Sequence, residues 1–203
     1  SFSKAIEVAV GPDELILIVC GNTVVIRSER LTVLIDPSDQ AGSFWKSVEP
    51  DIVLISHAHA DHFNGLANTS LPPGSLVVLS SLSRSIVLET LLSMDSAPAA
   101  SFVENNCHVM SPGDIQEFSG LQISAYRGGH CAGNLTYELH FKNEGMRVLA
   151  AGEFSLRSIG GEFGEIQAAR EPDIMLVDGH HVAHQHHPGE SFLQNNVAIL
   201  EIL

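Results

Sequence analysis

The stretch that decides the fold is DIVLISHAHADHF, residues 51–63. Its first half is short, apolar and rich in β-branched residues, which is typical of a buried β-strand. Its second half holds three histidines and one aspartate: His57, His59, Asp61 and His62. Imidazole and carboxylate groups are ligands of zinc, with iron and manganese as other occupants. The stretch therefore predicts a strand that ends in a metal site, against the alternative of a surface histidine cluster that binds cations by accident.

The pattern His-x-His-x-Asp-His after a strand resembles the signature of the metallo-β-lactamase superfamily of metal-dependent hydrolases. The resemblance can be followed from about residue 15 to about residue 185. It implies an α/β fold in which residues 1–203 form a single αββα sandwich, with a site for one or two zinc ions. Such ions lower the pKa of a bound water, and the resulting hydroxide would attack the substrate.

Composition bounds the class of protein. The chain has 203 residues, of which 44% are hydrophobic and 17% charged, so it can bury the core of a compact domain. Ten basic residues against 24 acidic ones give a formal net charge of −14. Such a surface repels polyanions at long range, so the charge does not support non-specific nucleic-acid binding, although it leaves room for a locally basic groove.

The cysteines and the apolar runs indicate the compartment. The three cysteines, Cys20, Cys107 and Cys131, are an odd number without the spacing of a disulfide framework. No stretch of 18 apolar residues occurs, and the first residues do not begin a secretory signal. We therefore expect a protein of the reducing cytoplasm without a membrane partner. The sequence leaves the oligomeric state open.

Apolar patterns predict the remaining elements. Short apolar runs separated by turn residues before residue 36 indicate hairpin-connected strands. Residues 81–94 fit an amphipathic helix. Residues 135–141 alternate as a strand that faces the core with every second side chain, which makes His140 a poor candidate for a ligand. After Pro188, the apolar pattern up to Leu203 indicates a final helix.

A third ligand histidine is implied by the resemblance. His130 follows an alternating strand and two glycines, which let the backbone turn sharply so that the imidazole can point inward. It stands where the superfamily has its next ligand histidine. Cys131 could also coordinate a metal, but adjacent residues usually point apart, so we do not expect it to be a ligand.

Two acids complete the implied site. Asp36 stands at a strand end before Pro37, which by itself is a common turn; in the superfamily an aspartate here is buried under the metals and orients a ligand histidine. Glu153 lies in Gly-Glu-Phe-Ser, where the RNA-processing branch has Gly-Asp-Phe-Ser or Gly-Asp-Tyr-Ser. Its longer side chain would bridge two ions or bind one of them, and the alternative is an ordinary acid at a helix start.

The last motif is rich in histidine. Asp178 ends a predicted strand, and His184 follows six residues later, a spacing that resembles the β-CASP nuclease branch. By that resemblance Asp178 supports the site, and His184 would protonate the leaving group. The alternative is a flexible polar loop, or a histidine-rich tract that binds metal by chance. One ligand histidine of the superfamily is missing; it lies beyond the end of a C-terminally truncated chain, is supplied by His184, His186 or His187, or is absent.

Three functions remain open. Two of them are catalytic, and in both Asp61 would orient the attacking water or accept its proton. The first is a phosphodiesterase of the RNase type, supported by Glu153 and its neighbours and by the Asp178 to His184 spacing. The second is a hydrolase of small esters, thioesters or lactones, which the acidic charge favours. The third is a degenerate, non-catalytic metal-binding member, suggested by Glu153 and by the missing ligand.

Overall fold

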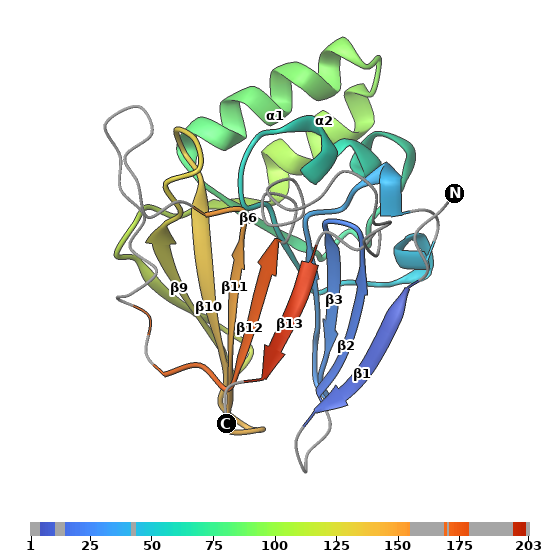
Figure 1. The fold of residues 1–203 in the computed structure, drawn as a ribbon. Helices are drawn as coiled ribbons and strands as arrows, with labels where there is room; N and C mark the ends of the chain where they lie inside the picture. Colours follow the sequence, from blue (N-terminus) through green and yellow to red (C-terminus); the bar gives the residue numbers. More distant parts are fainter. Residues whose placement is uncertain are drawn as a thin grey trace, which may run out of the picture.

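Two β-sheets stacked face to face form the body of the protein, and helices pack on the outer side of one of them (Figure 1). The computed structural model describes residues 5–10, 15–41, 44–154, 169, 171–178 and 197–201. The predicted α/β class and the two-sheet sandwich are confirmed. None of the helices among these residues is long and apolar enough to cross a membrane.

The first sheet has seven strands in chain order. They are β1 (Ile6–Val10), β2 (Leu15–Cys20), β3 (Thr23–Arg27), β4 (Thr32–Ile35), β5 (Ile52–Leu54), β6 (Leu76–Leu79) and β7 (Cys107–Val109). β1 to β4 are antiparallel, as the turn chemistry predicts, and β4 to β7 are parallel. The carboxyl ends of parallel strands meet at one edge, so the residues that follow β4 and β5 become neighbours.

The second sheet has six strands in the order β13-β12-β11-β10-β9-β8. They are β8 (Ile115–Phe118), β9 (Leu121–Arg127), β10 (Leu135–Phe141), β11 (Met146–Gly152), β12 (Ile174–Asp178) and β13 (Val197–Glu201). The final helix predicted after Pro188 is wrong over 197–201, where the chain pairs antiparallel with β12. A short apolar run with β-branched residues suits either element, and the open edge of β12 decides in favour of a strand.

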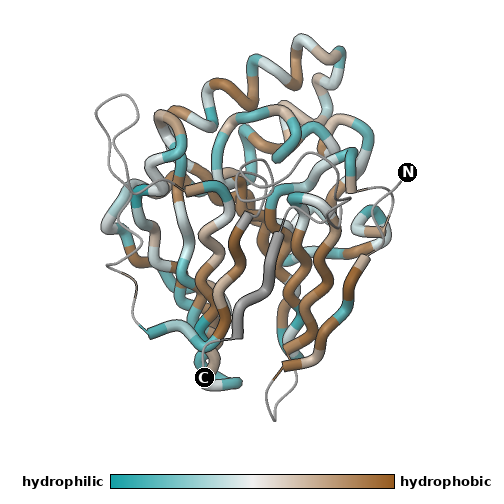
Figure 2. Tube along the Cα trace, viewed as in Figure 1, coloured by the Kyte–Doolittle hydropathy of each residue, from teal (hydrophilic) through white to brown (hydrophobic). Residues whose placement is uncertain are grey.

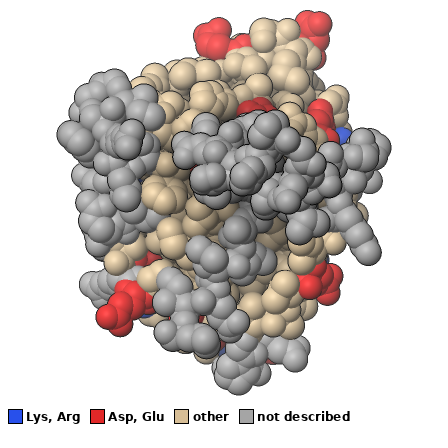
Figure 3. All heavy atoms as spheres, in the orientation of Figure 1, with Lys and Arg blue, Asp and Glu red and all other residues tan. Residues whose placement is uncertain are grey.

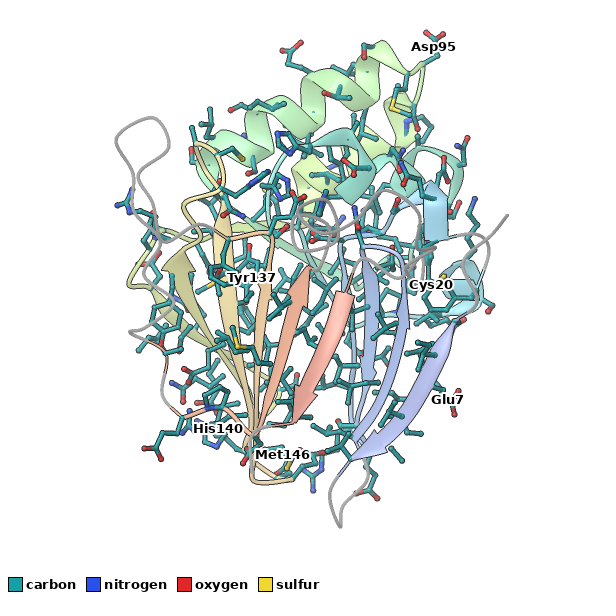
Figure 4. All side chains as sticks on the ribbon, in the orientation of Figure 1. Glu7, Cys20, Asp95, Tyr137, His140 and Met146 are labelled. Carbon is teal, nitrogen blue, oxygen red and sulfur yellow. The ribbon has the colours of Figure 1, made fainter. Side chains whose placement is uncertain are left out.

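The main core lies between the two sheets. Figure 2 shows the strands of both as predominantly hydrophobic. The predicted inward face of β10 is confirmed, because Leu135, Tyr137, Leu139 and Phe141 are all at most 1% exposed. Tyr137 also ties the sheets together, since its hydroxyl donates to the carbonyl oxygens of Ile55 (3.0 Å) and Val78 (3.4 Å) in the opposite sheet (Figure 4).

The helices cover the outer face of the seven-stranded sheet. They are α1 (Ser81–Ser93), α2 (Ala97–Asn106) and the short 3₁₀ turns η1 (Asp39–Ala41), η2 (Phe44–Ser47), η3 (Ala60–His62) and η4 (Asn64–Asn68). α1 confirms the predicted amphipathic helix, and Ser80 caps it by accepting a hydrogen bond from the backbone N–H of Ser83 (3.1 Å). α2 was not predicted; Pro98 lies in its first turn, where proline is tolerated.

Candidate metal centre

The turn after β5 presents three histidines to one point. His57 is fully buried, His62 is 3% exposed and His59 is 52% exposed. η3 turns the chain back at Ala60, which places His62 beside His57 with ring centroids 4.1 Å apart. The spacing of one residue between His57 and His59 brings His57 Nε2 within 2.8 Å of His59 Nδ1.

His130 reaches the same point from the other sheet. Its Nε2 lies 3.3 Å from His59 Nδ1. Zinc binds imidazole nitrogens at about 2.0–2.1 Å in a tetrahedron, which places such nitrogens about 3.3 Å from one another. His59 Nδ1 lies at 2.8 Å from His57 Nε2 and 3.3 Å from His130 Nε2, at or just below that value, and all three nitrogens lie within 4.8 Å of one another, so they can adjust to hold one zinc ion.

The loop that carries His130 is folded around Asn134. The side-chain Oδ1 of Asn134 accepts from the backbone N–H of His130 (3.2 Å), and its backbone carbonyl accepts from the N–H of Gly128 (3.0 Å). A Cβ at Gly128 would lie 1.7 Å from Asn134 Oδ1, so only glycine fits there. Leu135 N–H then donates to the carbonyl of Ser56 (2.8 Å), which fixes the loop next to the histidine turn.

Glu153 lies at the centre of the cluster. It follows β11, and its Oε2 is 2.9 Å from His130 Nε2, 3.3 Å from His57 Nε2 and 3.7 Å from His62 Nε2. Burial alone would raise the pKa of Glu153, but the hydrogen bonds from His130 and His57 outweigh it and hold the pKa far below its usual range. Glu153 is therefore an anion surrounded by imidazoles, a position from which one carboxylate reaches both ends of the site.

Asp36 orients His62 directly and His57 through Ser56. It is buried, has a left-handed backbone (φ +49°), and its Oδ2 lies 2.9 Å from His62 Nδ1. It accepts both the N–H (2.8 Å) and the hydroxyl (2.7 Å) of Ser56, and the Ser56 Oγ lies 2.9 Å from His57 Nδ1. With each Nδ1 engaged, the Nε2 atoms of His57 and His62 point to the cluster.

The same contacts shift the pKa values of the two buried histidines in opposite directions. Burial lowers the pKa of His57, with the hydrogen bond to Glu153 opposing it only in part. Burial also acts to lower the pKa of His62, but the Asp36 carboxylate more than compensates and raises that pKa to about 9. His57 is thus suited to be a neutral ligand, whereas His62 becomes one when a cation displaces its proton.

Asn22 belongs to the site although sequence reasoning missed it. It lies in the tight turn between β2 and β3, and its Nδ2 donates to Asp61 Oδ2 (3.1 Å) and lies 3.2 Å from His62 Nε2. The Gly21-Asn22 pair indicates only a turn, so the sequence carried no sign of this role. Asn22 thereby contacts two predicted ligands at once, whose own atoms are 3.9 Å apart.

Five of the six predicted metal ligands fall into two groups that share His57: His59 and His130 belong to one, and His62 and Glu153 to the other. The sixth, Asp61, lies next to His62, with its Oδ2 3.9 Å from His62 Nε2. Asp36 lies beside them. The backbone of Asp178 ends β12, as predicted, while its side chain and all of His184 lie outside the described residues. Whether each of the six binds metal stays a prediction.

Cys131 lies in the same cluster as His130, so the argument that the two adjacent side chains point apart is wrong, while its role as a ligand stays untested. Its Sγ and the ligand nitrogens of His57, His59 and His130 all lie within 4.8 Å of one another. The rule that adjacent side chains point apart holds for strands. Residues 130–133 form a bend and a turn instead, so His130 and Cys131 can face the same side.

Comparisons with known proteins agree with the fold. Residues 17–157 match the family described as the Beta-lactamase superfamily domain. A search of the curated proteins finds no match. Similar solved structures include a Cronobacter sakazakii metallo-β-lactamase with a HARLDQ motif, at 16% identity and a TM-score of 0.58, covering 87% of this chain and 79% of that one.

Two further structures show the same arrangement of strands and helices. MEM-A1, a subclass B3 metallo-β-lactamase from a soil metagenome library, has 17% identity and a TM-score of 0.52, covering 87% of this chain and 76% of that one. A Parabacteroides distasonis protein assigned as a metal-dependent hydrolase has 15% identity and a TM-score of 0.52, covering 74% of this chain. This chain spans 66% of the length of the Parabacteroides protein.

Proposed function

This chain belongs to the beta-lactamase superfamily of metal-dependent hydrolases, and we propose that within it the chain is a phosphodiesterase that uses a metal-activated water. The observation that carries the proposal is the position of Glu153. Its Oε2 lies within 3.3 Å of His57 and His130, members of the first group of ligands, and 3.7 Å from His62, a member of the second. A carboxylate in this place is suited to bridge two cations.

Two donor groups share Glu153. His57, His59 and His130 offer three nitrogens, and Asp61 and His62 offer an oxygen and a nitrogen. Two-metal sites favour in-line displacement at phosphorus, because they stabilise both the attacking and the leaving oxygen. Zinc suits this mixture of imidazole and carboxylate, with iron or manganese as alternatives. When bound, such an ion would lower the pKa of its water toward neutrality.

The chain's own groups would handle the proton and the orientation. The Asp61 side chain is 42% exposed, with one oxygen held by Asn22, so its carboxylate can orient the attacking water and accept a proton. Asp36 and Ser56 keep the Nε2 atoms of His57 and His62 directed at the site. His184, outside the described residues, would protonate the leaving oxygen, and Asp178 would support it, as the β-CASP spacing of the two suggests. The proposed setting is the cytoplasm.

A second candidate is a hydrolase of small esters, thioesters or lactones. The formal charge of −14 favours it, because polyanionic substrates are repelled at long range. On the face shown in Figure 3, acidic side chains are more evident than basic ones. A phosphodiesterase with this charge would act on a small or locally bound substrate instead of sliding along a nucleic acid.

The two candidates separate in one experiment. Zinc-loaded protein is offered bis-p-nitrophenyl phosphate, a p-nitrophenyl ester, a thioester and a lactone, alongside His57→Ala and the control His108→Ala, which removes a histidine of β7 outside the site. We expect kcat/KM to be highest for the phosphodiester, unchanged by His108→Ala and abolished by His57→Ala. A higher kcat/KM for one of the carbonyl substrates would establish the second candidate instead. Activity on none of the four would overturn both.

A further inference from the structure

We propose that Cys131 is a fourth protein ligand of the ion held by His57, His59 and His130. In a tetrahedral His₃Cys form the thiolate would take the position that water holds in the proposed reaction, so the ion would alternate between a closed form with Cys131 bound and an open form with water. The inference needs only the metal site and not the hydrolytic reaction proposed above, so the two can fail separately.

The first argument is the distance from the Cys131 sulfur to the three histidine nitrogens. Cys131 Sγ lies within 4.8 Å of the ligand nitrogen of each of the three histidines. In a tetrahedral zinc site with bonds of about 2.3 Å to sulfur and about 2.0–2.1 Å to nitrogen, the sulfur lies about 3.5 Å from each nitrogen. The remaining gap of at most about 1.3 Å is within the reach of a side-chain rotation, because Cys131 is partly exposed and lies in a turn.

The backbone holds this thiol in place. Asn134 N–H donates to the carbonyl of Cys131 (3.1 Å), and the Asn134 side chain accepts from His130 N–H (3.2 Å). The Ser83 hydroxyl donates to the carbonyl of Gly133 (3.3 Å), which fastens the end of the turn to the first turn of α1. One asparagine thus positions both the histidine and the cysteine of the cluster.

A thiolate ligand would change both the metal preference of the site and its access to water. Cys131 would bind as the thiolate, and its proton would pass to solvent when the ion enters. A thiolate favours zinc over manganese or magnesium, which prefer oxygen ligands. Structural zinc sites are closed by four protein ligands, whereas catalytic ones keep a position open for water. Cys131 would therefore compete with water for the fourth position and hold the ion tightly at the expense of turnover.

The other cysteines provide controls. Cys20 is buried, and its thiol donates to the carbonyl of Ala41 (3.4 Å). Cys107 begins β7, and its sulfur accepts from Arg84 Nε (3.2 Å). Neither is a member of the histidine cluster. Cys107, which like Cys131 is partly exposed, is the matched control for both substitution and chemical labelling.

Cobalt(II) tests the ligand directly, because a cobalt-bound thiolate produces a strong near-ultraviolet charge-transfer absorption that imidazole and carboxylate do not. The chain, Cys131→Ser and Cys107→Ser are each loaded with cobalt alone. We expect the absorption in the chain and in Cys107→Ser and its loss in Cys131→Ser. Zinc affinity, from competition with a chelator, should fall about tenfold or more in Cys131→Ser only, since even outer partners of a ligand contribute 10–100-fold. No charge-transfer band in the chain, or an unchanged band in Cys131→Ser, would overturn the proposal.

Alkylation needs no variant and covers the case in which Cys131→Ser fails to fold. The chain is treated with iodoacetamide with and without zinc, and the labelled peptides are counted by mass spectrometry. Zinc should slow labelling of Cys131 strongly and leave that of Cys107 unchanged. Equal labelling of Cys131 with and without zinc would overturn the inference. A protein that shows zinc protection but hydrolyses nothing would retain this ligand and lose only the proposed reaction.

Discussion

The two halves of the metal centre are built by different means. His57 and His62 are at most 3% exposed, and their Nδ1 atoms are fixed by hydrogen bonds to Ser56 and Asp36. His59 and His130 are 52% and 18% exposed and face the site through surface turns. The buried half is therefore prepared before any ion arrives, whereas the exposed half can adjust to the ion and to the substrate. Each half can be broken by its own substitution.

The largest effect is expected in the buried half. Asp36→Ala removes the acceptor of His62 and of both Ser56 donors in a buried place, so the free energy of unfolding should fall by about 3–5 kcal/mol. Asp95→Ala is the control, because Asp95 has the same left-handed backbone (φ +56°) but is exposed. Urea unfolding of the metal-free proteins measures both. Equal losses in the two variants would show that backbone strain, and not the hydrogen bonds of Asp36, sets the stability.

The exposed half should lose metal affinity more than stability. Gly128→Ala puts a Cβ 1.7 Å from Asn134 Oδ1, which must displace the loop and move His130. We expect zinc affinity to fall about tenfold or more and the free energy of unfolding to fall by about 1–3 kcal/mol. Gly74→Ala, where a Cβ meets nothing within 4 Å, should change neither. Unchanged zinc binding in Gly128→Ala would remove His130 from the proposed ligands.

Asn22, next to Asp61 and His62, is placed to control the affinity of the proposed second ion. Asn22→Asp replaces the amide between Asp61 and His62 with a third carboxylate, so a second divalent ion should bind about tenfold more tightly, or ~1.4 kcal/mol. Calorimetric titration with zinc gives both the affinity and the number of ions. Asn105→Asp adds the same charge on α2 and should leave the titration as it is. An equal gain in both variants would mean that net charge, not the site, is responsible.

The smallest effect concerns the tyrosine beneath the site. Tyr137→Phe removes the hydrogen bonds to Ile55 and Val78, so it should cost about 1 kcal/mol at neutral pH. Burial, assisted by the Asp36 charge, raises the pKa of Tyr137 well above its usual value, so the folded state keeps this proton when the unfolded chain loses it. The stability of the protein should therefore fall relative to Tyr137→Phe as the pH rises above about 10. Urea unfolding measures both proteins, and a difference in their free energies of unfolding that stays constant across that pH range would contradict this.

The sequence predicted the fold and the convergence of the ligands for the same reason. The predicted metal site uses His57, His59 and His130, which the sequence shows as typical ligand residues that follow predicted strands. The pattern could therefore be found without coordinates. β13 could not, because a short apolar run suits a helix as well as a strand until the open edge of β12 is known. The membership of the superfamily is confirmed, while the nuclease branch stays a prediction.

Sequence reasoning missed one residue of the site and set another aside, and both lie in turns. Asn22 reaches Asp61 only because the β2–β3 hairpin folds over the site, and a Gly-Asn pair indicates no more than the turn itself. Cys131 was set aside by a rule for strands, although the hydrogen bonds around Asn134 make that segment a turn. Side-chain directions in turns depend on such tertiary contacts, which the spacing of residues in a sequence does not record.

The most direct test of the metal centre is the anomalous X-ray signal of zinc in crystals of the loaded protein. We predict a peak about 2.0–2.1 Å from His57 Nε2, His59 Nδ1 and His130 Nε2, with Glu153 next to it. Zinc found only on the histidines of residues 180–187, with none among these three nitrogens, would contradict the account.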